Sequence, residues 1–401
     1  MKIALCCPAS LPATQFGGIL FLCVDLAREF SKKDNKVTIY TTDLNFANNP
    51  KTFSKKLARE EKIENFLIKR THVWFSFALY YINFGMYFQM MKEEIDILHT
   101  VGIRSFQSFV AALVSKKKKI PLIIADQGGL TTHPELKEAG IIKKILYKLQ
   151  KPILKFIINQ STKIIVANEY EKKIFLEFTN ESKIEVIKNG INLEQFKIEN
   201  KILREKFEIN ESFILFLGRF NKVKGIDVLL LAINHIKKKI IEKNIKIVIM
   251  GVDFGYQEEM LQMIKDLKIN KLIKVIKNPS REEVIEAYQE CEFLVLPSRW
   301  ELSPLTPLEG FTFKKPVIST NAHGIPYTIK NNINCILVEP ENHEKIGDAM
   351  IDLINDKSKI QKLGENGFNQ IKTECNSKIM AEKVFELYKK TLNEFNKDNN
   401  K

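Results

Sequence analysis

The sequence has few of the residues that mark secreted, metal-binding or fibrous proteins. Its six cysteines form no Cys-x-x-Cys pair and no set with metal-ligand spacing, and it has neither an Asp-x-Asp motif nor a histidine cluster. Seventeen glycines and 13 prolines in 401 residues are too few for collagen. The N-terminal stretch MKIALCCPASLPATQFGG has only a short apolar run broken by prolines, unlike a signal peptide. We therefore expect buried free thiols, no bound metal, no disulfide scaffold and a cytoplasmic location.

Acidic residues are the minority among the charged side chains. Sixty-two Lys and Arg against 48 Asp and Glu give a net charge of +14, and residues 1–200 carry +10 of it (30 − 20). Such a basic excess favours an anionic partner, namely nucleic acid, acidic membrane lipid or a phosphate-bearing substrate. The content of 45% apolar and 10% aromatic residues argues against disorder, and the length predicts two domains.

One stretch without charge, residues 73–91, is nominally long enough to cross a membrane. Asn83, Gly85 and Gln89 interrupt it, and eight of its residues are aromatic, which favours an interface over the hydrocarbon centre. Three interpretations remain open: a transmembrane span, a buried helix, or a helix that faces the acceptor or the membrane.

Short β-branched runs alternate with helical stretches along the whole chain, for example KVTIYTT, KIENFLIK, PLIIAD, FILFLGRF, IKIVIMG and FLVLPS. Continuous apolar strands between helices are typical of parallel sheets covered on both faces. We predict an α/β fold with two doubly wound, Rossmann-like domains, residues 1–195 and 205–372, which face each other across a cleft. An amphipathic helix over residues 376–396 follows. Because ligands of such sheets lie beyond the carboxyl ends of the strands, the loops after strands should carry the chemistry.

Two of these loops contain candidate anion-binding residues. Gly17 and Gly18 open the first predicted helix, where backbone amides either bind an anion or are purely structural. The strand FILFLG ends at Gly218, and Arg219 and Lys224 follow it. Their charges suit a diphosphate, and two solvated surface charges are the alternative.

The loop PSRWELSPLTPLEGF carries the strongest signal. Glu301 and Glu309 lie eight residues apart, and a helix is predicted to begin between them. Thr306, Pro307 and Glu309 have the form of a capping box with proline at the first helical position, so Glu309 either satisfies an amide or binds a ligand. Glu301 has no such structural role, and the free amides of residues 304–306 should form an anion site.

Taken in order, these motifs resemble the retaining glycosyltransferases of the GT-B fold, family 4. The shared motifs are GG after the first strand, NGIN (189–192), GRFNKVKG (218–225), GVDFG (251–255) and the Glu-x7-Glu spacing. The resemblance covers about residues 1–350 and implies that the final helix crosses back to the first domain. It implies sugar transfer, of the hexosyltransferase class, from a UDP- or GDP-sugar to a glycan or lipid-linked acceptor, without cofactor or metal.

The resemblance also implies roles for individual residues. Arg219 and Lys224 would bind the donor diphosphate and stabilise the charge that develops on it as the leaving group. Glu301 would contact the transferred sugar, and Glu309 would hold the ribose hydroxyls. The remaining donor-binding positions are backbone groups of Gly17, Gly18, Gly218, Leu305 and Thr306.

The chain departs from the family pattern in two loops. Many relatives place a histidine after the fifth strand, where this chain has Gln127, so a histidine role there is lost. His133 is either an ordinary loop histidine or reaches the acceptor, and Asn189 lies at the domain junction, where similar enzymes use it less directly. The loop ELSPLTPLEGF replaces the commoner Gly-Phe-Gly and should be stiffer.

Other functions remain open. One is a nucleotide-sugar epimerase of similar two-domain shape, and another is a non-catalytic basic protein that binds membrane or nucleic acid. Against nucleic acid, the basic residues accompany Leu and Ile on helices, without a recognition motif. Residues 141–160 carry five lysines and no acid, residues 116–119 add four more lysines, and Pro152 should break the helix. This pattern predicts peripheral contact with anionic lipid on the cytoplasmic face.

Overall fold

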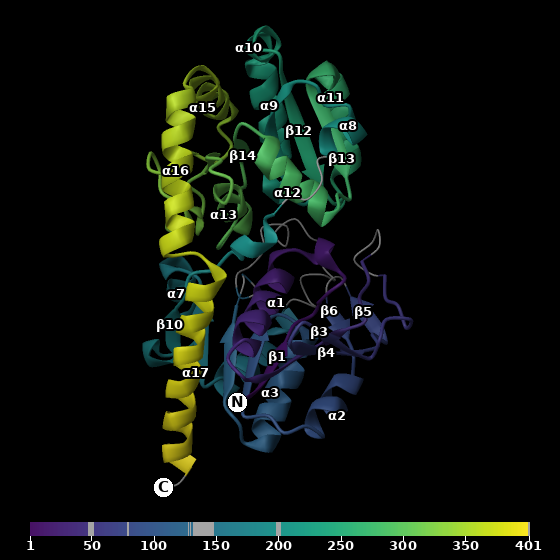
Figure 1. Cartoon of the computed structure of the whole chain (residues 1–401), viewed down its shortest axis with the longest axis vertical. Coiled ribbons are helices and arrows are strands. Elements are labelled where there is room, and N and C mark those ends of the chain that lie inside the picture. Colours follow the sequence, from purple (N-terminus) through teal and green to yellow (C-terminus); the bar gives the residue numbers. More distant parts are fainter. Residues whose placement is uncertain are drawn as a thin grey trace. The chain divides into compact units, whose positions relative to one another are not determined.

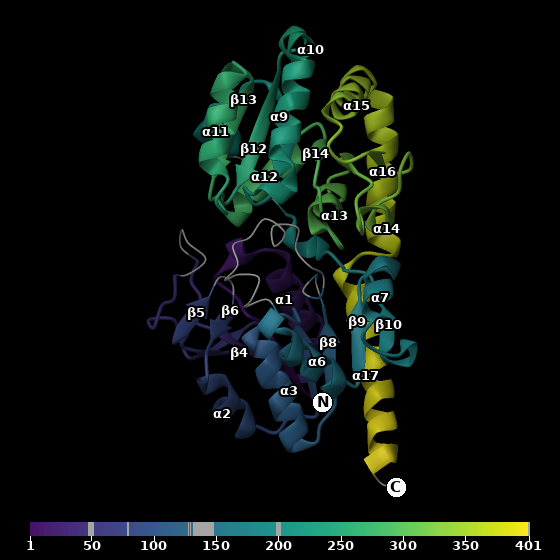
Figure 2. The same ribbon diagram turned by 180° about the vertical axis from the view of Figure 1, so that it is seen from behind.

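The computed structural model describes residues 1–46, 52–77, 80–126, 128, 130, 148–197 and 202–399. The chain divides into two compact units (Figures 1 and 2). Unit 1 comprises Met1–Gly190 together with Ser377–Lys401, and unit 2 comprises Ile191–Asn376. The chain therefore leaves unit 1 after Gly190 and returns to it with its last helix.

Unit 1 is built on an eight-stranded sheet with the strand order β10-β9-β8-β7-β1-β2-β4-β3. Neighbouring strands pair in parallel except β3 and β4. The central strands are almost entirely buried, as expected for a parallel sheet covered on both faces. The strands are β1 (Lys2–Cys6), β2 (Lys36–Thr42), β3 (Glu60–Ile63), β4 (Phe66–Thr71), β7 (Ile97–Val101), β8 (Leu122–Ala125), β9 (Lys163–Val166) and β10 (Ile184–Val186).

The prediction of one strand at KIENFLIK is wrong, because the structure has two strands there. Ile63 ends β3 and Phe66 begins β4, and these two residues face each other in an antiparallel pair. Glu64 adopts φ +51°, in the left-handed region, so the chain reverses within two residues. Both halves of the segment suit a strand, and the pattern of apolar residues therefore hides the turn.

The helices of unit 1 cover its sheet and keep the last segment of the chain in place. Helix α3 contacts both α2 and α6, and α17 contacts α1. Tyr388 of α17 is fully buried, and its ring centre lies 5.3 Å from that of Phe30 on α1. The helices in the described part of this unit are α1 (Gly18–Ser31), α2 (Gly85–Met91), α3 (Phe106–Lys118), α6 (Lys151–Gln160), α7 (Glu169–Phe175) and α17 (Ser377–Asn399).

The uncharged stretch 73–91 is neither a membrane span nor a single helix. It forms strands β5 (Phe75–Phe77) and β6 (Tyr80–Ile82), which pair antiparallel, and then helix α2. The side-chain amide of buried Asn83 donates hydrogen bonds to the Thr71 hydroxyl (2.8 Å) and the Thr41 carbonyl, which holds the chain between β6 and α2. In the described part of the chain, no helix is long and apolar enough to cross a bilayer.

Unit 2 contains a six-stranded parallel sheet with the order β13-β12-β11-β14-β15-β16. The strands are β11 (Ser212–Leu217), β12 (Ile245–Gly251), β13 (Ile273–Lys277), β14 (Leu294–Leu296), β15 (Val317–Thr320) and β16 (Cys335–Val338). The helices are α8 (Leu203–Phe207), α9 (Ile226–His235), α10 (Lys237–Glu242), α11 (Gln257–Asp266), α12 (Arg281–Glu290), α13 (Leu305–Phe311), α14 (Ile325–Thr328), α15 (His343–Asn355) and α16 (Lys357–Thr373). The predicted α/β class with parallel, Rossmann-like sheets is confirmed.

Candidate active site

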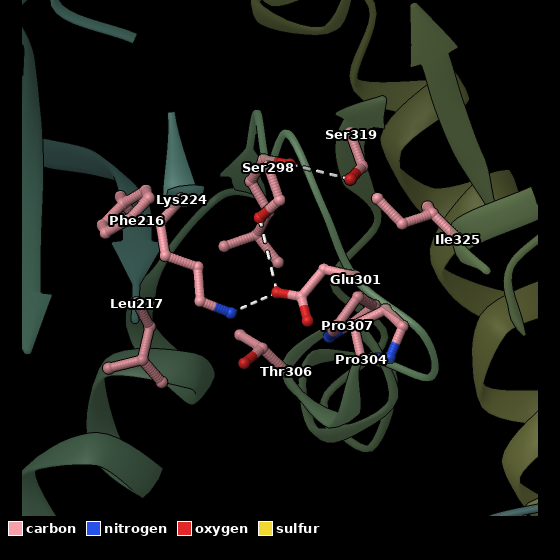
Figure 3. Close-up of a pocket in the computed structure, with 11 residues that line it drawn as sticks. Phe216, Leu217, Lys224, Ser298, Glu301, Pro304, Thr306, Pro307, Ser319 and Ile325 are labelled. Atoms are coloured by element: carbon pink, nitrogen blue, oxygen red, sulfur yellow. Dashed lines mark hydrogen bonds and ion pairs between the residues drawn. The ribbon is translucent and has the colours of Figure 1, made fainter. Parts of the chain in front are cut away.

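The direction of strand order reverses between β11 and β14 in unit 2, and a pocket lies at this reversal. From β11 the chain order continues to β12 and β13 on one side, and β14, β15 and β16 follow on the other side. Open α/β sheets bind ligands at such switch points, beyond the carboxyl ends of the strands. Figure 3 shows the pocket, which has a volume of about 300 Å³ with its open mouth included. It is lined by Phe216, Leu217, Lys224, Leu296, Ser298, Glu301, Pro304, Thr306, Pro307, Ser319 and Ile325.

Lys224 enters the pocket from a short 3-10 turn, Lys222–Lys224, that follows β11. The side chain of Asn221 caps this turn by accepting a hydrogen bond from the Lys224 amide at 3.2 Å. Gly225 follows with φ +67°, and a Cβ atom there would lie 2.0 Å from the carbonyl oxygen of Pro297. Only glycine allows this close approach, which brings the turn against the end of β14.

Glu301 meets Lys224 inside the pocket. The Lys224 ammonium forms an ion pair with Glu301 Oε1, and Ser298 donates a weaker hydrogen bond of 3.4 Å to the same oxygen (Figure 3). The loop that carries Glu301 is pinned by Gly324, whose amide donates to the Glu301 carbonyl at 2.9 Å. A Cβ atom on Gly324 would lie 1.8 Å from the Leu302 carbonyl oxygen, so this position also requires glycine.

Arg219 lies just beyond the end of β11 but outside the residues that line the pocket. Its guanidinium group sits 4.6 Å from the ring centre of Phe254, in a cation–π contact. Two backbone hydrogen bonds hold the loop after β12 against Phe220, from Phe220 N to Val252 O (2.8 Å) and from Phe254 N to Phe220 O (3.0 Å). They place the Phe254 ring next to Arg219. The structure thus brings Lys224, Glu301 and Thr306 around one pocket, while Arg219 contacts Phe254 and is not among the lining residues.

The predicted capping box of Thr306, Pro307 and Glu309 is wrong. Helix α13 begins at Leu305, its N-cap residue is Pro304, and no side chain caps it. Pro304 has no N–H, so of the predicted anion-binding amides only those of residues 305 and 306 remain. Because Pro304 is the N-cap residue, the first helical residue is Leu305, and Pro307 occupies the third helical position instead of the first.

Glu309 has its two carboxylate oxygens in use. Arg281 on α12 donates to Oε1 at 2.9 Å, and the Tyr288 hydroxyl, also on α12, donates to Oε2 at 2.7 Å. The guanidinium of Arg281 in turn covers the ring of Phe196 at 4.9 Å. Burial, together with the Glu309 carboxylate, raises the pKa of Tyr288 well above its ordinary value, so the hydroxyl keeps its proton and remains a donor.

Two family models match the chain. Residues 16–195 match Glycosyltransferase Family 4, and residues 199–370 match Glycosyl transferases group 1. The chain is 31% identical over 279 residues to an uncharacterized glycosyltransferase of Methanocaldococcus jannaschii, and this match covers 69% of the chain and 70% of that relative. The chain belongs to the GT-B glycosyltransferases of the family 4 type.

Further similarities agree with this placement. The glycosyltransferase is 24% identical over 322 residues to the UDP-Gal:alpha-D-GlcNAc-diphosphoundecaprenol alpha-1,3-galactosyltransferase of Escherichia coli, across 76% of this chain and 78% of the relative. A glycosyltransferase structure from Rickettsia africae matches with a TM-score of 0.72 at 21% identity, covering 98% of both chains. Anabaena HepE in complex with UDP-glucose matches with a TM-score of 0.73 at 14% identity, covering 97% of this chain and all of the other.

Arg299 is a residue of this glycosyltransferase that the sequence reasoning missed. Its guanidinium forms a bidentate pair with Asp227 at 2.8 and 2.7 Å, and it also donates to Glu341 and to the Lys222 carbonyl. Its amide donates to the Val223 carbonyl at 2.8 Å. Arg299 therefore joins the turn that carries Lys224 to the loop that carries Glu301. Its position next to Ser298 at a strand end was the available signal.

The structure describes only some of the site residues that were predicted in unit 1. Gly17 adopts φ +99°, and α1 begins at Gly18 without a capping side chain, while Asn189 is buried. Gln127 and His133 lie outside the described residues. The predictions of ligand contact for Gly17, Gly18 and Asn189 stay predictions.

Two buried carboxylates at the carboxyl edge of the unit 1 sheet were also missed. Asp126 follows β8 and accepts a hydrogen bond from the Leu130 amide at 3.1 Å, and Glu171 in α7 accepts one from the Ala167 amide at 2.7 Å. Both side chains are buried. Burial, with a smaller contribution from the Asp126 charge, raises the pKa of Glu171 to about 8. Among the residues that the structure describes, no group of His, Cys, Asp or Glu is arranged to hold a metal ion.

Proposed function

We propose that this glycosyltransferase moves a sugar from a nucleotide diphosphate sugar to a glycan or lipid-linked acceptor, with retention of the anomeric configuration. The observation that carries the proposal is the meeting of Lys224, Glu301 and the start of α13 at the switch point of a parallel sheet. A cation and free helix amides at this pocket suit the diphosphate and the charge that develops on it, and a carboxylate suits the sugar hydroxyls.

The Lys224–Glu301 pair suggests how the donor is received. A diphosphate that binds between Lys224 and the amides of Leu305 and Thr306 would compete with Glu301 for the ammonium group. Glu301 would then be released from the pair and could accept hydrogen bonds from the sugar hydroxyls. The ion pair keeps both side chains ordered until that exchange.

The positive charges act on the leaving group. When the bond between the anomeric carbon and the diphosphate oxygen breaks, negative charge grows on the diphosphate, and Lys224 and Arg219 stabilise the transition state more than the ground state. The acceptor hydroxyl oxygen forms the new bond to the anomeric carbon from the same face, and its proton passes to the departing diphosphate oxygen. We assign no protein nucleophile to this step. Glu309, oriented by Arg281 and Tyr288, is proposed to hold the ribose hydroxyls through its remaining lone pairs.

The names of relatives support the choice of substrates. The E. coli relative is named for a UDP-Gal donor and a diphosphoundecaprenol-linked acceptor, and a fold neighbour was solved with UDP-glucose. We therefore propose a UDP-sugar, with a GDP-sugar as the alternative, and an acceptor carried by a membrane lipid.

A lipid-linked acceptor requires the enzyme to work at a membrane surface. Lys116 and Lys117 at the end of α3 and Lys151 and Lys155 on α6 are exposed, and these helices contain no acidic residue. Each lysine near an anionic surface contributes roughly 1 kcal/mol. We propose that these lysines hold the enzyme at the cytoplasmic face.

A donor screen tests the proposed reaction. Purified full-length protein is incubated with a panel of UDP- and GDP-sugars, and released nucleoside diphosphate is measured with and without acceptor lipid extract. Release that depends on acceptor and on Lys224 supports the proposal. Conversion of the donor to its epimer without release of nucleoside diphosphate would indicate an epimerase. Absence of turnover with every donor would refute the proposal.

A further inference from the structure

The exposed aromatic residues of this chain are concentrated in one short segment. Eleven large apolar side chains are exposed among the described residues, and five of them lie between positions 74 and 88. These five form what we call the aromatic ridge, with their exposed fractions: Trp74 (74%), Phe75 (61%), Phe77 (41%), Phe84 (57%) and Phe88 (64%). Exposed apolar side chains scattered singly are ordinary. These five lie on adjoining elements whose rings meet at Phe106, 6.2 Å from Tyr80 and 5.5 Å from Phe84, and such a grouping favours an interaction surface.

The local structure forces the first part of the ridge outward. In the β5–β6 hairpin, Phe75 lies opposite Ile82 and Phe77 opposite Tyr80, whereas Ser76 and Tyr81 occupy the other face. Tyr81 is fully buried, with its ring centre 5.2 Å from that of Phe53 and 6.3 Å from that of Phe16. Because the hairpin is anchored through Tyr81, Phe75 and Phe77 must point away from the core.

Helix α2 presents the second part in the same way. Met86 and Met90, four residues apart, are fully buried on one face of the helix. Phe84 at its N-cap and Phe88, also four residues apart, fall on the opposite face. The ridge is therefore held by buried anchors on both of its elements.

The ridge continues into a path of aromatic rings across the neighbouring helices. Ring centres lie 5.5 Å apart for Phe84 and Phe106, 6.2 Å for Phe106 and Phe109, and 5.9 Å for Phe109 and Phe156. The path ends at Lys116, whose ammonium group lies 5.8 Å from the ring centre of Phe156. Figure 2 shows the elements concerned, β5, β6, α2, α3 and α6, within unit 1.

The segments that carry this path have charges of one sign. Residues 73–91, α3 and α6 together contain no Asp or Glu. Their exposed lysines are Lys116, Lys117, Lys151 and Lys155, and Lys92 and Lys119 directly follow α2 and α3. Of the acids after α2, Glu93 is paired with Lys69 at 2.6 Å and Glu94 with Lys2. The partner of this surface should therefore be anionic and should accept aromatic rings.

We propose that the aromatic ridge inserts into the headgroup region of an anionic bilayer while the lysines of α3 and α6 contact the lipid phosphates. Tryptophan and phenylalanine rings flanked by lysines are typical of protein surfaces that bind at the membrane interface. A second copy of this chain would bring like charges together, which opposes self-association through this face. The inference deepens the proposed function, on whose lipid-linked acceptor it rests.

The two contributions respond differently to salt. Screening at about 1 M salt, where the Debye length is about 3 Å, removes most of the lysine contribution. Burial of aromatic rings is not weakened by salt. Insertion of the ridge therefore predicts vesicle binding that persists in part at high salt, whereas lysine contact alone predicts complete release.

The test measures sedimentation of the full-length protein with vesicles of equal parts phosphatidylcholine and phosphatidylglycerol, at low and high salt. The ridge variant carries Trp74→Ser, Phe75→Ser, Phe84→Ser and Phe88→Ser, and we expect its partition coefficient to fall about tenfold or more, with no binding left at high salt. The matched control places serine at four exposed apolar residues elsewhere, Leu176, Phe178, Ile241 and Ile333. It should bind like the unmodified protein.

A second readout does not depend on multiple substitutions. Trp74 and Trp300 are the two tryptophans, so a Trp300→Phe variant reports Trp74 fluorescence alone. We expect a blue shift on anionic vesicles and quenching by lipids labelled near the headgroup. An unshifted and unquenched Trp74, or complete release of the protein by salt, would overturn the insertion.

Two further outcomes also count against the bilayer. Unchanged vesicle binding by the ridge variant with loss of transfer only to lipid-linked acceptor would make the ridge a site for the acceptor chain. A change confined to oligomeric state, measured by analytical centrifugation, would make it an interface between copies. Release of nucleoside diphosphate from the donor with acceptor lipid dispersed in detergent, where no vesicle is present, separates failure of this inference from failure of the proposed reaction.

Discussion

Glu309 offers the sharpest test of the site, because two properties are predicted to change together. Its carboxylate accepts hydrogen bonds from Arg281 at 2.9 Å and from Tyr288 at 2.7 Å, and the side chains of Glu309 and Arg281 are only 13% and 21% exposed. Substitution by alanine removes both bonds and leaves the fully buried Tyr288 hydroxyl without its acceptor. The first expectation is therefore a loss of stability in unit 2.

The size of that loss follows from the contacts. A buried hydroxyl left unsatisfied costs about 1–3 kcal/mol, and breaking a fully buried ion pair costs about 3–5 kcal/mol, which partial exposure reduces here. We expect Glu309→Ala to lower the free energy of unfolding by about 2–4 kcal/mol. For a domain of this size class, about 2–4 °C in Tm accompanies each kcal/mol, so the Tm should fall by roughly 4–16 °C.

The second expectation concerns the donor. If Glu309 holds the ribose hydroxyls, loss of its charge removes hydrogen bonds worth about 1.5–3 kcal/mol, and the donor KM should rise by about tenfold or more. Glu309→Gln keeps an acceptor for Tyr288 and should lose less stability than alanine while still raising the donor KM. Tyr288→Phe is the matched control, since it weakens the network and leaves the Glu309 charge in place.

The assay combines thermal unfolding with steady-state kinetics at a temperature well below every Tm. A donor KM that stays unchanged in Glu309→Gln would refute the ribose role and leave Glu309 as a structural acceptor. An unchanged Tm in Glu309→Ala would instead refute the reasoning from the Arg281 and Tyr288 contacts.

Three further predictions follow from other contacts. Arg219→Ala and Lys224→Ala should each lower kcat about 100-fold or more, with exposed Lys222→Ala as the control; near-normal kcat in both would rule out their proposed role at the donor diphosphate. Burial lowers the pKa of His99 to about 3, so its ring is neutral, and it shares a hydrogen bond with the Tyr388 hydroxyl. Tyr388→Phe removes this buried bond and should lower the free energy of unfolding of unit 1 in urea by about 1–3 kcal/mol. An unchanged midpoint of urea unfolding would contradict this. The pKa of Glu171, raised from 4.5 to about 8, means that the folded state holds a proton that the unfolded chain releases, so stability should fall as pH rises between about 5 and 8. Glu171→Gln should flatten that slope, which is at most about 1.4 kcal/mol per pH unit, and equal slopes for the two proteins would rule the account out.

Within unit 1, the shape of residues 73–91 could not be predicted from the sequence. The lack of charge in residues 73–91 indicated burial or contact with an apolar partner, but it did not indicate which secondary structure they form. The hairpin and helix there depend on hydrogen bonds from Asn83 to Thr71 and Thr41, the latter 42 residues away. Such bonds leave no periodic trace in the sequence, because they join residues of separate elements.

The sequence by itself determined the α/β class and the loops that hold the site. Parallel strands need apolar side chains on both faces, so β11, β12 and β14 appear as continuous apolar runs, and the residues that follow them necessarily lie at one edge of the sheet. For this reason Lys224 and Glu301 were found as candidates from local pattern alone.

Only the tertiary structure decided how those candidates are paired. Lys224 and Glu301 are 77 residues apart, Arg299 and Asp227 are 72 apart, and Arg281 and Glu309 are 28 apart. The capping box was predicted from the spacing of Thr306 and Glu309 in the sequence, whereas the actual partners of Glu309 come from α12. Periodicity and spacing record contacts between near neighbours, while a charge partner is chosen by which strands lie side by side, and that is settled only when the whole sheet has formed.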